Sequence, residues 1–302
     1  VAGLTVTLAS LPAQPAEPLQ VAAKRKECMS ARPMQMVEAN LRVGLSRAQV
    51  SADLARVFRT DPDFVALNEV AGRPDHLLTP DGYQIWRTPG KYTGANPVVW
   101  NAERWNATAQ GTIYVSNQTG IPAGKKTHLG LRYANWVTLR SVDNCQTISV
   151  ISYHVAPKGR TTTKLLIPSV HKIGGLVSQL AAEGPVLAAG DLNRHHGSRA
   201  YPRAELTSYG MTPTWDMTGR RLPTGDHQGA TIDFIFVHDA AQFTVARQVT
   251  RELRSDHDAV VADLVFNPSV PVARASATFV RGHVVNIPTA ARASKRAVLD
   301  RI

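Results

Sequence analysis

Cysteine is almost absent from this chain, since Cys28 and Cys145 are the only two in 302 residues. Two isolated cysteines cannot build a disulfide-rich scaffold, and without matching histidine spacing they do not make a zinc site. If the chain is exported they can form one disulfide, and otherwise they are two thiols. The sequence alone leaves this choice open.

Long apolar runs and aromatic residues are also scarce. Outside the first residues, no apolar run approaches the roughly 20 residues that a membrane span needs, so we expect no stable membrane insertion. Aromatic residues make up 6% of the chain. Four tryptophans lie in strand-like patterns, which favours a place in the core over a role in stacking nucleic-acid bases. They are Trp86, Trp100, Trp105 and Trp136.

Acidic residues are in deficit, with 23 Asp and Glu against 34 Lys and Arg, which gives a net charge of +11 and a pI near 10.0. Such a balance favours an anionic partner, either nucleic acid or an anionic membrane. Part of the excess is local, because residues 267–302 contain six basic residues and one acidic residue. A charged tail or general solubility is therefore the alternative explanation.

The ends of the chain differ in composition from its middle. Residues 1–18, "VAGLTVTLASLPAQPAEP", fit a signal-peptide apolar core followed by a small-residue cleavage region, which predicts a secreted protein. A plain strand with a Pro-rich linker, in a cytoplasmic protein, is the alternative. We divide the chain into a signal-like and linker segment (1–30), a folded domain (31–267) and a basic C-terminal tail (268–302), and expect a monomer.

Hydrophobic patterns predict many strands and few helices. Residues 46–58 predict a helix that starts with a capping box of Ser46 and Gln49, and a second helix is predicted near 162–182 although Pro168 and two glycines weaken its pattern. The predicted strands are 34–42, 64–70, 83–88, 96–105, 111–117, 135–142, 146–155, 185–193, 231–238, 242–250 and 259–266. A long polar loop is predicted at 194–230. Because strands and helices do not alternate regularly, we expect an α+β fold, a sandwich of sheets inside two helical layers.

Polar residues gather where these predicted strands begin or end. Catalytic groups are often held in this way, because a rigid sheet fixes their positions. Each residue taken singly also fits an ordinary turn, a cap or a solvated edge, but the whole series does not. The residues are Asn40, Glu69, His154, Asp191, Asn193, Asp233, Asp256 and His257.

The motifs "EANLR", "LNEV", "SYHVAPKG", "AAGDLNR", "TIDFIFV" and "RSDHDAV" follow one another in the chain. In this order they resemble the deoxyribonuclease I-like endonuclease/exonuclease/phosphatase superfamily over roughly residues 34–266. The resemblance implies a four-layered α/β sandwich with two packed, mainly antiparallel sheets. It also implies that water cleaves a phosphoester with the help of a divalent cation, usually Mg²⁺, with Mn²⁺ or Ca²⁺ as alternatives. Asn68 and Leu192 stand where many members carry Gln and Phe.

The resemblance assigns metal-binding positions to Asn40 and Glu69, and Asp256 would hold a second metal or support the attacking water. Magnesium prefers oxygen ligands of this kind. Asp191 would orient or deprotonate the water, and Asn193 would donate hydrogen bonds to a phosphate oxygen. Which carboxylate acts as the base stays open.

Two histidines complete this set. His257 would contact the phosphate, while Asp233 would accept a hydrogen bond from its ring and favour the cationic form. His154 would be a second phosphate contact or the acid that protonates the leaving oxygen.

Several basic residues follow these motifs. Lys158, Arg160 and Arg194 are candidates for contacts with a nucleic-acid backbone, although charged loop residues are often only solvated. A further polar group consists either of loop residues or of substrate contacts. It comprises His195, His196, Asp226 and His227.

Three functions fit these features. The first is a secreted, divalent-metal-dependent endonuclease that cleaves DNA, with RNA as a further substrate. The second is a phosphodiesterase or phosphatase acting on sphingomyelin or phosphoinositides. The third is a non-catalytic module that binds nucleic acid through the basic tail. A candidate residue for every catalytic role favours an enzyme, and the net charge favours nucleic acid as its partner.

Overall fold

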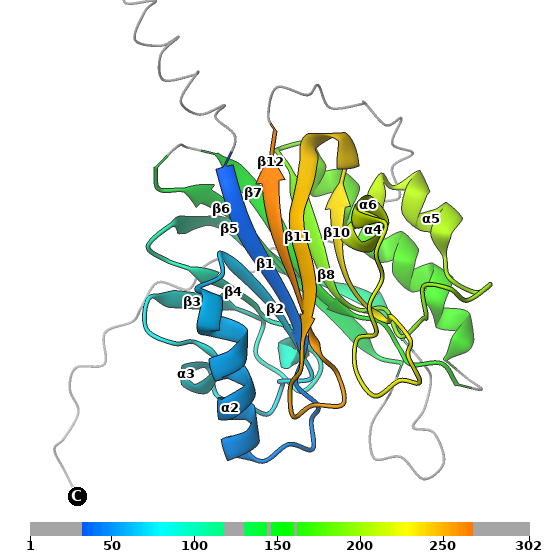
Figure 1. The fold of residues 1–302 in the computed structure, drawn as a ribbon, viewed down its shortest axis with the longest axis horizontal. Helices are drawn as coiled ribbons and strands as arrows, with labels where there is room; N and C mark the ends of the chain where they lie inside the picture. Colours follow the sequence, from blue (N-terminus) through cyan, green and yellow to red (C-terminus); the bar gives the residue numbers. More distant parts are fainter. Residues whose placement is uncertain (1–31, 118–129, 144–145, 160–161, 268–302) are drawn as a thin grey trace, which may run out of the picture.

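Two six-stranded sheets dominate the computed structural model, which describes residues 32–117, 130–143, 146–159 and 162–267 (Figure 1). Sheet A has the order β11–β12–β1–β2–β4–β3. Its strands are β1 (Arg32–Asn40), β2 (Phe64–Asn68), β3 (Tyr83–Trp86), β4 (Val98–Asn101), β11 (Phe243–Arg251) and β12 (Ala259–Phe266). Sheet B has the order β5–β6–β7–β8–β10–β9. Its strands are β5 (Trp105–Ser116), β6 (Arg132–Ser141), β7 (Thr147–His154), β8 (Val186–Asp191), β9 (Met211–Pro213) and β10 (Asp233–His238).

Helices lie on the outer side of each sheet (Figure 1). On the side of sheet A are α2 (Arg47–Val57) and α3 (Asp75–Leu78), and on the side of sheet B are α4 (Leu166–Ala181) and α5 (Arg203–Ser208). The short helix α6 (Thr214–Thr218) contacts both β10 of sheet B and β11 of sheet A. Neighbouring strands pair antiparallel except for β1–β2 and β7–β8, which are parallel. The predicted α+β sandwich of mainly antiparallel sheets is therefore confirmed. None of the described helices is both long enough and apolar enough to cross a membrane.

Local sequence explains the two longest helices. The Ser46 hydroxyl accepts a hydrogen bond from the Gln49 N–H, and the Gln49 side chain accepts one from the Ser46 N–H, so the predicted capping box starts α2. In α4, Pro168 lies in the first turn, where backbone N–H groups have no hydrogen-bond partner within the helix. Its missing N–H therefore costs the helix no hydrogen bond. Gly174 of the same helix packs against the ring of Tyr209, a contact that leaves no room for a Cβ atom.

Two predicted boundaries are wrong. Residues 96–105 are not one strand, because β4 ends at Asn101, whose side chain accepts a hydrogen bond from the Glu103 N–H and closes a turn before β5 begins at Trp105. The segment predicted as a polar loop at 194–230 contains α5, β9 and α6. Its helices are short, so they lack the long periodic pattern that reveals a helix in a sequence.

Alternation along β1 places one end of the strand at the junction of the sheets. Met34 and Met36 belong to the core between the two sheets, whereas Val37 and Ala39 belong to a second core beneath α2. Because successive side chains of a strand point to opposite faces, Asn40 continues the row that faces sheet B. The tryptophans follow the prediction, since Trp100, Trp105 and Trp136 are buried and Trp86 packs against the same core.

Several predicted features lie outside the described residues. They are the signal-like segment, the basic tail at 268–302, Arg160 and both cysteines. The division of the chain into three parts therefore stays a prediction, and the pairing of Cys28 with Cys145 stays open.

Gly190 sets the spacing of the central strands in sheet B. It has φ +155°, and a Cβ atom there would lie 1.8 Å from the carbonyl oxygen of Tyr153 on β7. We expect Gly190→Ala to lower the free energy of unfolding by about 3 kcal/mol or more, because the backbone must move. Denaturant unfolding measures this loss. Gly175→Ala is the control, because that exposed helical position has nothing within 4 Å, and there we expect a gain of about 1 kcal/mol. Equal effects at both positions would contradict the argument.

Candidate active site

Three of the predicted site residues lie side by side in one row of sheet B. The strand register pairs His154 of β7 with Asp191 of β8, and Asp191 with Asp233 of β10. Across the sandwich, Asn40 pairs with Asn68 where the parallel strands β1 and β2 end. The Asn68 side-chain oxygen accepts a hydrogen bond of 2.9 Å from the Asp191 N–H, which joins the two sheets at the site. The sequence patterns did not predict this role of Asn68.

One carboxylate oxygen, Oδ2 of Asp191, lies at the centre of the site. Four side-chain nitrogens surround it: Asn193 Nδ2 at 2.9 Å, His154 Nε2 at 3.3 Å, Asn40 Nδ2 at 3.4 Å and His257 Nε2 at 3.9 Å. The other oxygen accepts a hydrogen bond of 2.6 Å from the Asn193 N–H. The structure thus brings together five predicted residues from separate parts of the chain.

Burial and neighbouring charges set the protonation of this group. Burial, together with the charge of Asp233, raises the pKa of Asp191 to about 8, although His257 and the Asn193 N–H oppose the rise. Burial lowers the pKa of His257, but the hydrogen bond and charge of Asp233, with Asp191 and Asp256 adding to them, outweigh burial and raise that pKa to about 9. The His257 Nδ1 lies 2.9 Å from Asp233 Oδ2, which is the predicted contact. At neutral pH His257 is therefore a cation.

His154 has the opposite character. Burial, reinforced by the positive charges of Arg132 and His257, holds its pKa well below the ordinary value. Its Nδ1 is buried and has no partner among the described residues, while Nε2 lies 2.9 Å from Asn193 Nδ2 and 3.3 Å from Asp191. The site therefore contains one neutral and one cationic histidine.

The segment before His257 is held from two sides. The Ser255 hydroxyl donates to the Asn40 carbonyl at 2.7 Å and lies within hydrogen-bond distance of the His257 N–H. The buried carboxylate of Asp53, on α2, accepts the N–H groups of Arg254 and Ser255. The first residue of the "SDH" motif thus ties this segment to the end of β1.

Two predicted metal ligands behave differently. Glu69 has φ +64°, a conformation that costs energy for a non-glycine residue and is found at functional sites, and its Oε2 accepts the Val43 N–H at 2.9 Å. The carboxylate of Asp256 is half-buried, and its Oδ2 lies 3.8 Å from the Arg42 guanidinium. Asp256 acts on His257 through its charge, and its role toward a metal stays a prediction.

The side chains present fit a divalent cation. The amide oxygen of Asn40 is fully buried and has no hydrogen-bond partner among the described residues. Ligand atoms of Asp191, Asp233 and His257 lie within 4.8 Å of one another. Hard cations such as Mg²⁺ prefer oxygen ligands, and a buried amide oxygen beside carboxylates offers them.

Besides Asn68, two further residues of the site were not predicted from the sequence patterns. Burial lowers the pKa of Arg132, at the start of β6, while the charges of Glu69 and Asp191 act against that shift. Glu38 is fully buried on β1, and burial together with Asp233 and Asp191 raises its pKa well above the usual range. Alternation with Met34, Met36 and Asn40 could have placed Glu38 between the sheets. Arg132 carried no such signal, because the strand was expected to begin at residue 135.

The predicted substrate residues do not form one group. Lys158 is exposed just beyond β7, whereas Arg194 is buried and burial lowers its pKa. His196 is also buried, with its Nε2 2.8 Å from Asp216, so it belongs to the packing of the segment after β8. The ring of His227 instead lies 4.4 Å from the ring of His257, next to the site.

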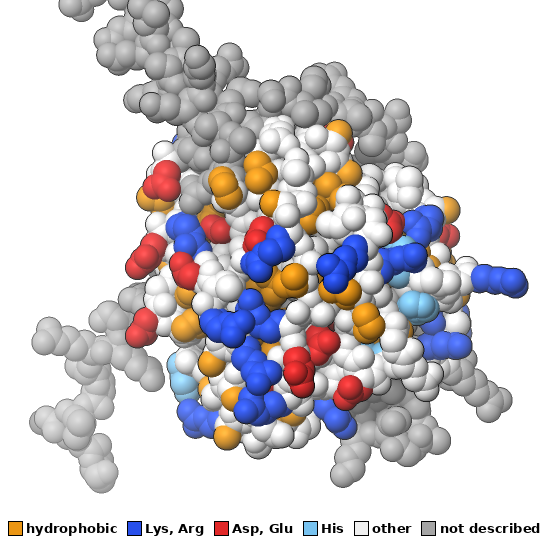
Figure 2. Space-filling model, in the orientation of Figure 1, with side chains coloured by type: hydrophobic (Ala, Val, Ile, Leu, Met, Phe, Trp, Pro, Cys, Tyr) orange, Lys and Arg blue, Asp and Glu red, His pale blue; other side chains and the backbone are white. Residues whose placement is uncertain are grey.

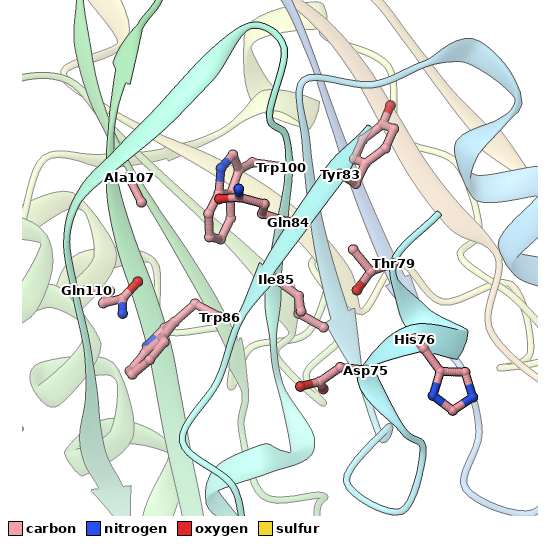
Figure 3. Close-up of a pocket in the computed structure, with 10 residues that line it drawn as sticks. All are labelled: Asp75, His76, Thr79, Tyr83, Gln84, Ile85, Trp86, Trp100, Ala107 and Gln110. Carbon is pink, nitrogen blue, oxygen red and sulfur yellow. The ribbon is translucent and has the colours of Figure 1, made fainter. Parts of the chain in front are cut away.

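A separate pocket of about 470 Å³ lies along the edge strand β3. Figure 3 shows its lining side chains, which come from α3, β3, β4 and β5. None of the ten lining residues belongs to the group around Asp191. The chemistry described above therefore does not reside in this pocket.

The family model of the endonuclease/exonuclease/phosphatase family matches residues 37–257. The chain belongs to this family. The match begins in β1 and ends at His257, so it spans the site described above. Members of this family are phosphoesterase hydrolases that depend on divalent metal, and this protein is accordingly a phosphoesterase of the same family. No curated protein sequence matches the chain.

Solved structures show the same fold at low sequence identity. An endonuclease/exonuclease/phosphatase from Bacteroides vulgatus aligns with a TM-score of 0.61 and 16% identity, over 78% of this chain and 99% of that one. The human nocturnin catalytic domain aligns with a TM-score of 0.59 and 17% identity, over 78% of this chain and 94% of that one. D. rerio TDP2 in complex with a single-strand DNA product aligns with a TM-score of 0.57 and 14% identity, over 77% of this chain and 98% of that one.

In this phosphoesterase, the charge on His257 makes stability depend on pH. Its pKa is raised from 6.5 to about 9, so the stabilisation is complete below about pH 6.5 and is lost as the pH rises through about 9. In metal-free protein, we expect His257→Gln to lower the free energy of unfolding by up to about 3 kcal/mol at low pH and by much less above pH 9. Denaturant unfolding of both proteins across this range measures the difference, and a constant difference would contradict the assignment.

A second prediction concerns the metal. A divalent cation at one hundred times its dissociation constant should stabilise the wild type by about 2.7 kcal/mol, because only the folded state binds it. We expect Asn40→Ala and Glu69→Gln to lose most of this gain, measured as the thermal shift with Mg²⁺ or Mn²⁺. Glu103→Gln, which removes an exposed carboxylate outside the site, is the control. An unchanged shift in both site variants would place the metal elsewhere.

Proposed function

We propose that this phosphoesterase is a Mg²⁺-dependent nuclease that hydrolyses phosphodiester bonds in DNA, with RNA as a further substrate. The single observation that carries the proposal is the surrounding of Asp191 Oδ2 by Asn193, His154, Asn40 and His257. A buried carboxylate held by neutral donors on one side and a cationic histidine on the other can orient water beside a bound phosphate.

The side chains have distinct tasks in this mechanism. Asn40 and Glu69 would hold a divalent cation, which when bound would supply charge stabilisation and polarise a phosphoryl oxygen. In its ionised form Asp191 orients the attacking water and accepts its proton, and because burial raises its pKa to about 8, this form gains population as the pH rises toward that value. Asn193 fixes the Asp191 carboxylate through two hydrogen bonds. His257, kept cationic by Asp233, donates from Nε2 to a phosphate oxygen. His154, neutral and beside Asn193, donates a hydrogen bond to a phosphate oxygen. A neutral imidazole is too weak an acid to protonate the leaving oxygen, so the cationic His257 is the histidine able to protonate it.

Charge supports nucleic acid as the substrate. The chain carries +11, and Arg132 adds a half-buried cation that interacts electrostatically with Glu69 and Asp191. Lys158 adds an exposed cation just beyond His154. The structurally similar D. rerio TDP2 was solved with a single-strand DNA product. Secretion and a monomeric state remain parts of the proposal, and the first rests on residues 1–18 alone.

A phosphomonoesterase is the second candidate, because a similar structure is the mannosyl-6-phosphatase Bt3783 of Bacteroides thetaiotaomicron. The two enzymes would use the same residues and differ in what surrounds the phosphate. Sphingomyelin and phosphoinositides belong in the same substrate panel.

Nicking of supercoiled plasmid is the first test. We expect nicking with Mg²⁺ and none with EDTA, and we expect Asp191→Asn and His257→Ala to lower the rate by about 10²–10⁴-fold. Glu103→Gln serves as the control and should nick at the wild-type rate.

The small substrates separate the alternatives. Hydrolysis of bis-p-nitrophenyl phosphate together with nicking supports the nuclease. If folded protein leaves plasmid intact and hydrolyses a sugar phosphate, sphingomyelin or a phosphoinositide through Asp191, the nuclease assignment is wrong and the mechanism stands.

A further inference from the structure

A group of arginines covers the outer side of sheet A where α2 packs beside β11. We call it the arginine ridge. Figure 2 shows Lys and Arg side chains gathered over α2 and the neighbouring part of β11. The members of the ridge are Arg42, Arg56, Arg59, Arg251 and Arg254.

Main-chain carbonyls, more than carboxylates, hold the middle of the ridge. Arg56 Nη1 donates to the carbonyl of Glu252 at 2.7 Å, and Arg251 Nη1 donates to the carbonyl of Arg56 at 2.5 Å. A carbonyl fixes a guanidinium in place without cancelling its charge. Burial lowers the pKa of Arg251, and the positive charges of Arg59 and Arg247 lower it further. The guanidinium groups of the ridge therefore lie close enough to repel one another.

The carboxylates near the ridge neutralise it only in part. Arg254 lies 3.8 Å from Asp53, and Arg42 lies 3.8 Å from Asp256. Asp53 is fully buried and already accepts two backbone N–H groups, and both arginine side chains remain about half exposed. The largely exposed Arg42–Asp256 pair contributes little at 3.8 Å, and the Asp53 carboxylate is already engaged by backbone N–H groups, so both guanidinium groups stay available to an external anion.

The ridge begins at the active site. Arg42 follows the candidate metal ligand Asn40 by two residues, and Arg254 precedes Asp256 by two residues. From there the ridge follows α2 away from the site to Arg56 and Arg59. Along α2, the nine helical steps from the first residue, Arg47, to Arg56 of the ridge cover about 14 Å of helix axis, which matches roughly four nucleotides of one B-DNA strand.

We propose that the arginine ridge binds the phosphate backbone of a polynucleotide on one side of the bond being cleaved. The inference rests on the proposed nuclease function and adds a surface to it. A polymer whose cleaved phosphate lies beside Asp191 must leave the site over neighbouring surface, and the ridge offers there a row of cations that carboxylates neutralise only in part. The basic tail at 268–302 has the same sign of charge as the ridge, so it is not suited to cover it.

Binding and small-substrate hydrolysis test the ridge separately from catalysis. We would measure the anisotropy of labelled single- and double-stranded oligonucleotides in EDTA, between about 50 and 200 mM salt. Arg59→Glu should weaken binding by about fivefold or more and lower the salt slope by about 1, because each phosphate contact releases counterions. Arg251→Gln should act in the same direction. Both variants should hydrolyse bis-p-nitrophenyl phosphate at the wild-type rate, since neither residue belongs to the site.

Arg140→Glu is the matched control, because Arg140 is an exposed arginine on β6 of the other sheet and the change in net charge is the same. Equal losses in Arg59→Glu and Arg140→Glu would overturn the ridge as a local surface, and so would unchanged binding in Arg59→Glu and Arg251→Gln. Loss of binding to anionic phospholipid vesicles without loss of oligonucleotide binding would also overturn it, in favour of a membrane. If wild-type protein hydrolyses no diester but loses oligonucleotide binding in the ridge variants, the nuclease function fails and the ridge stands.

Discussion

The register of three neighbouring strands is the constraint on which the site depends. His154, Asp191 and Asp233 share one row of β7, β8 and β10. Side chains alternate along a strand, so a slip of one residue would turn a member of the row to the opposite face. Gly190 allows β8 to approach the Tyr153 carbonyl, and the hydrogen bond from Asp191 to Asn68 fixes sheet B against sheet A. The backbone thus fixes the positions of these side chains before any ligand binds.

This arrangement has an electrostatic cost. Asp191 and Asp233 are buried and lie directly across from each other, and like charges in such a pair repel. His257 offsets the cost, because its ring contacts Asp233 and also faces Asp191. Its position in turn requires Ser255, which bonds to the end of β1, and Asp53, which α2 contributes. The helix packed on sheet A therefore supports a group that acts on sheet B.

The sequence predicted the site residues that lie inside motifs and missed those that depend on tertiary contact. "GDLN" and "SDH" carry their residues at fixed spacing beside apolar strands, so Asp191, Asn193 and His257 could be predicted. The hydrophobic pattern predicts that β6 begins at residue 135, but the strand begins three residues earlier, at Arg132. Only this earlier start brings Arg132 close enough to Glu69 to interact with its charge. Arg194 was predicted to contact a nucleic-acid backbone, but it is buried. The sequence could not show this, because its burial depends on how the segment after β8 packs.

The active site and the arginine ridge carry opposite charges and therefore interact differently with phosphate. The centre of the site is rich in acids, and burial together with Asp233 and Asp191 favours the protonated form of Glu38 beneath it. An acidic centre repels phosphate, so a divalent cation and His257 are needed to make it receptive to an anion. The arginine ridge attracts phosphate without any such help, because carbonyls hold the guanidinium groups of Arg56 and Arg251 and leave their charge uncancelled. Affinity for a polymer and chemistry on a single phosphate are therefore separable properties, carried by different side chains on the same sandwich.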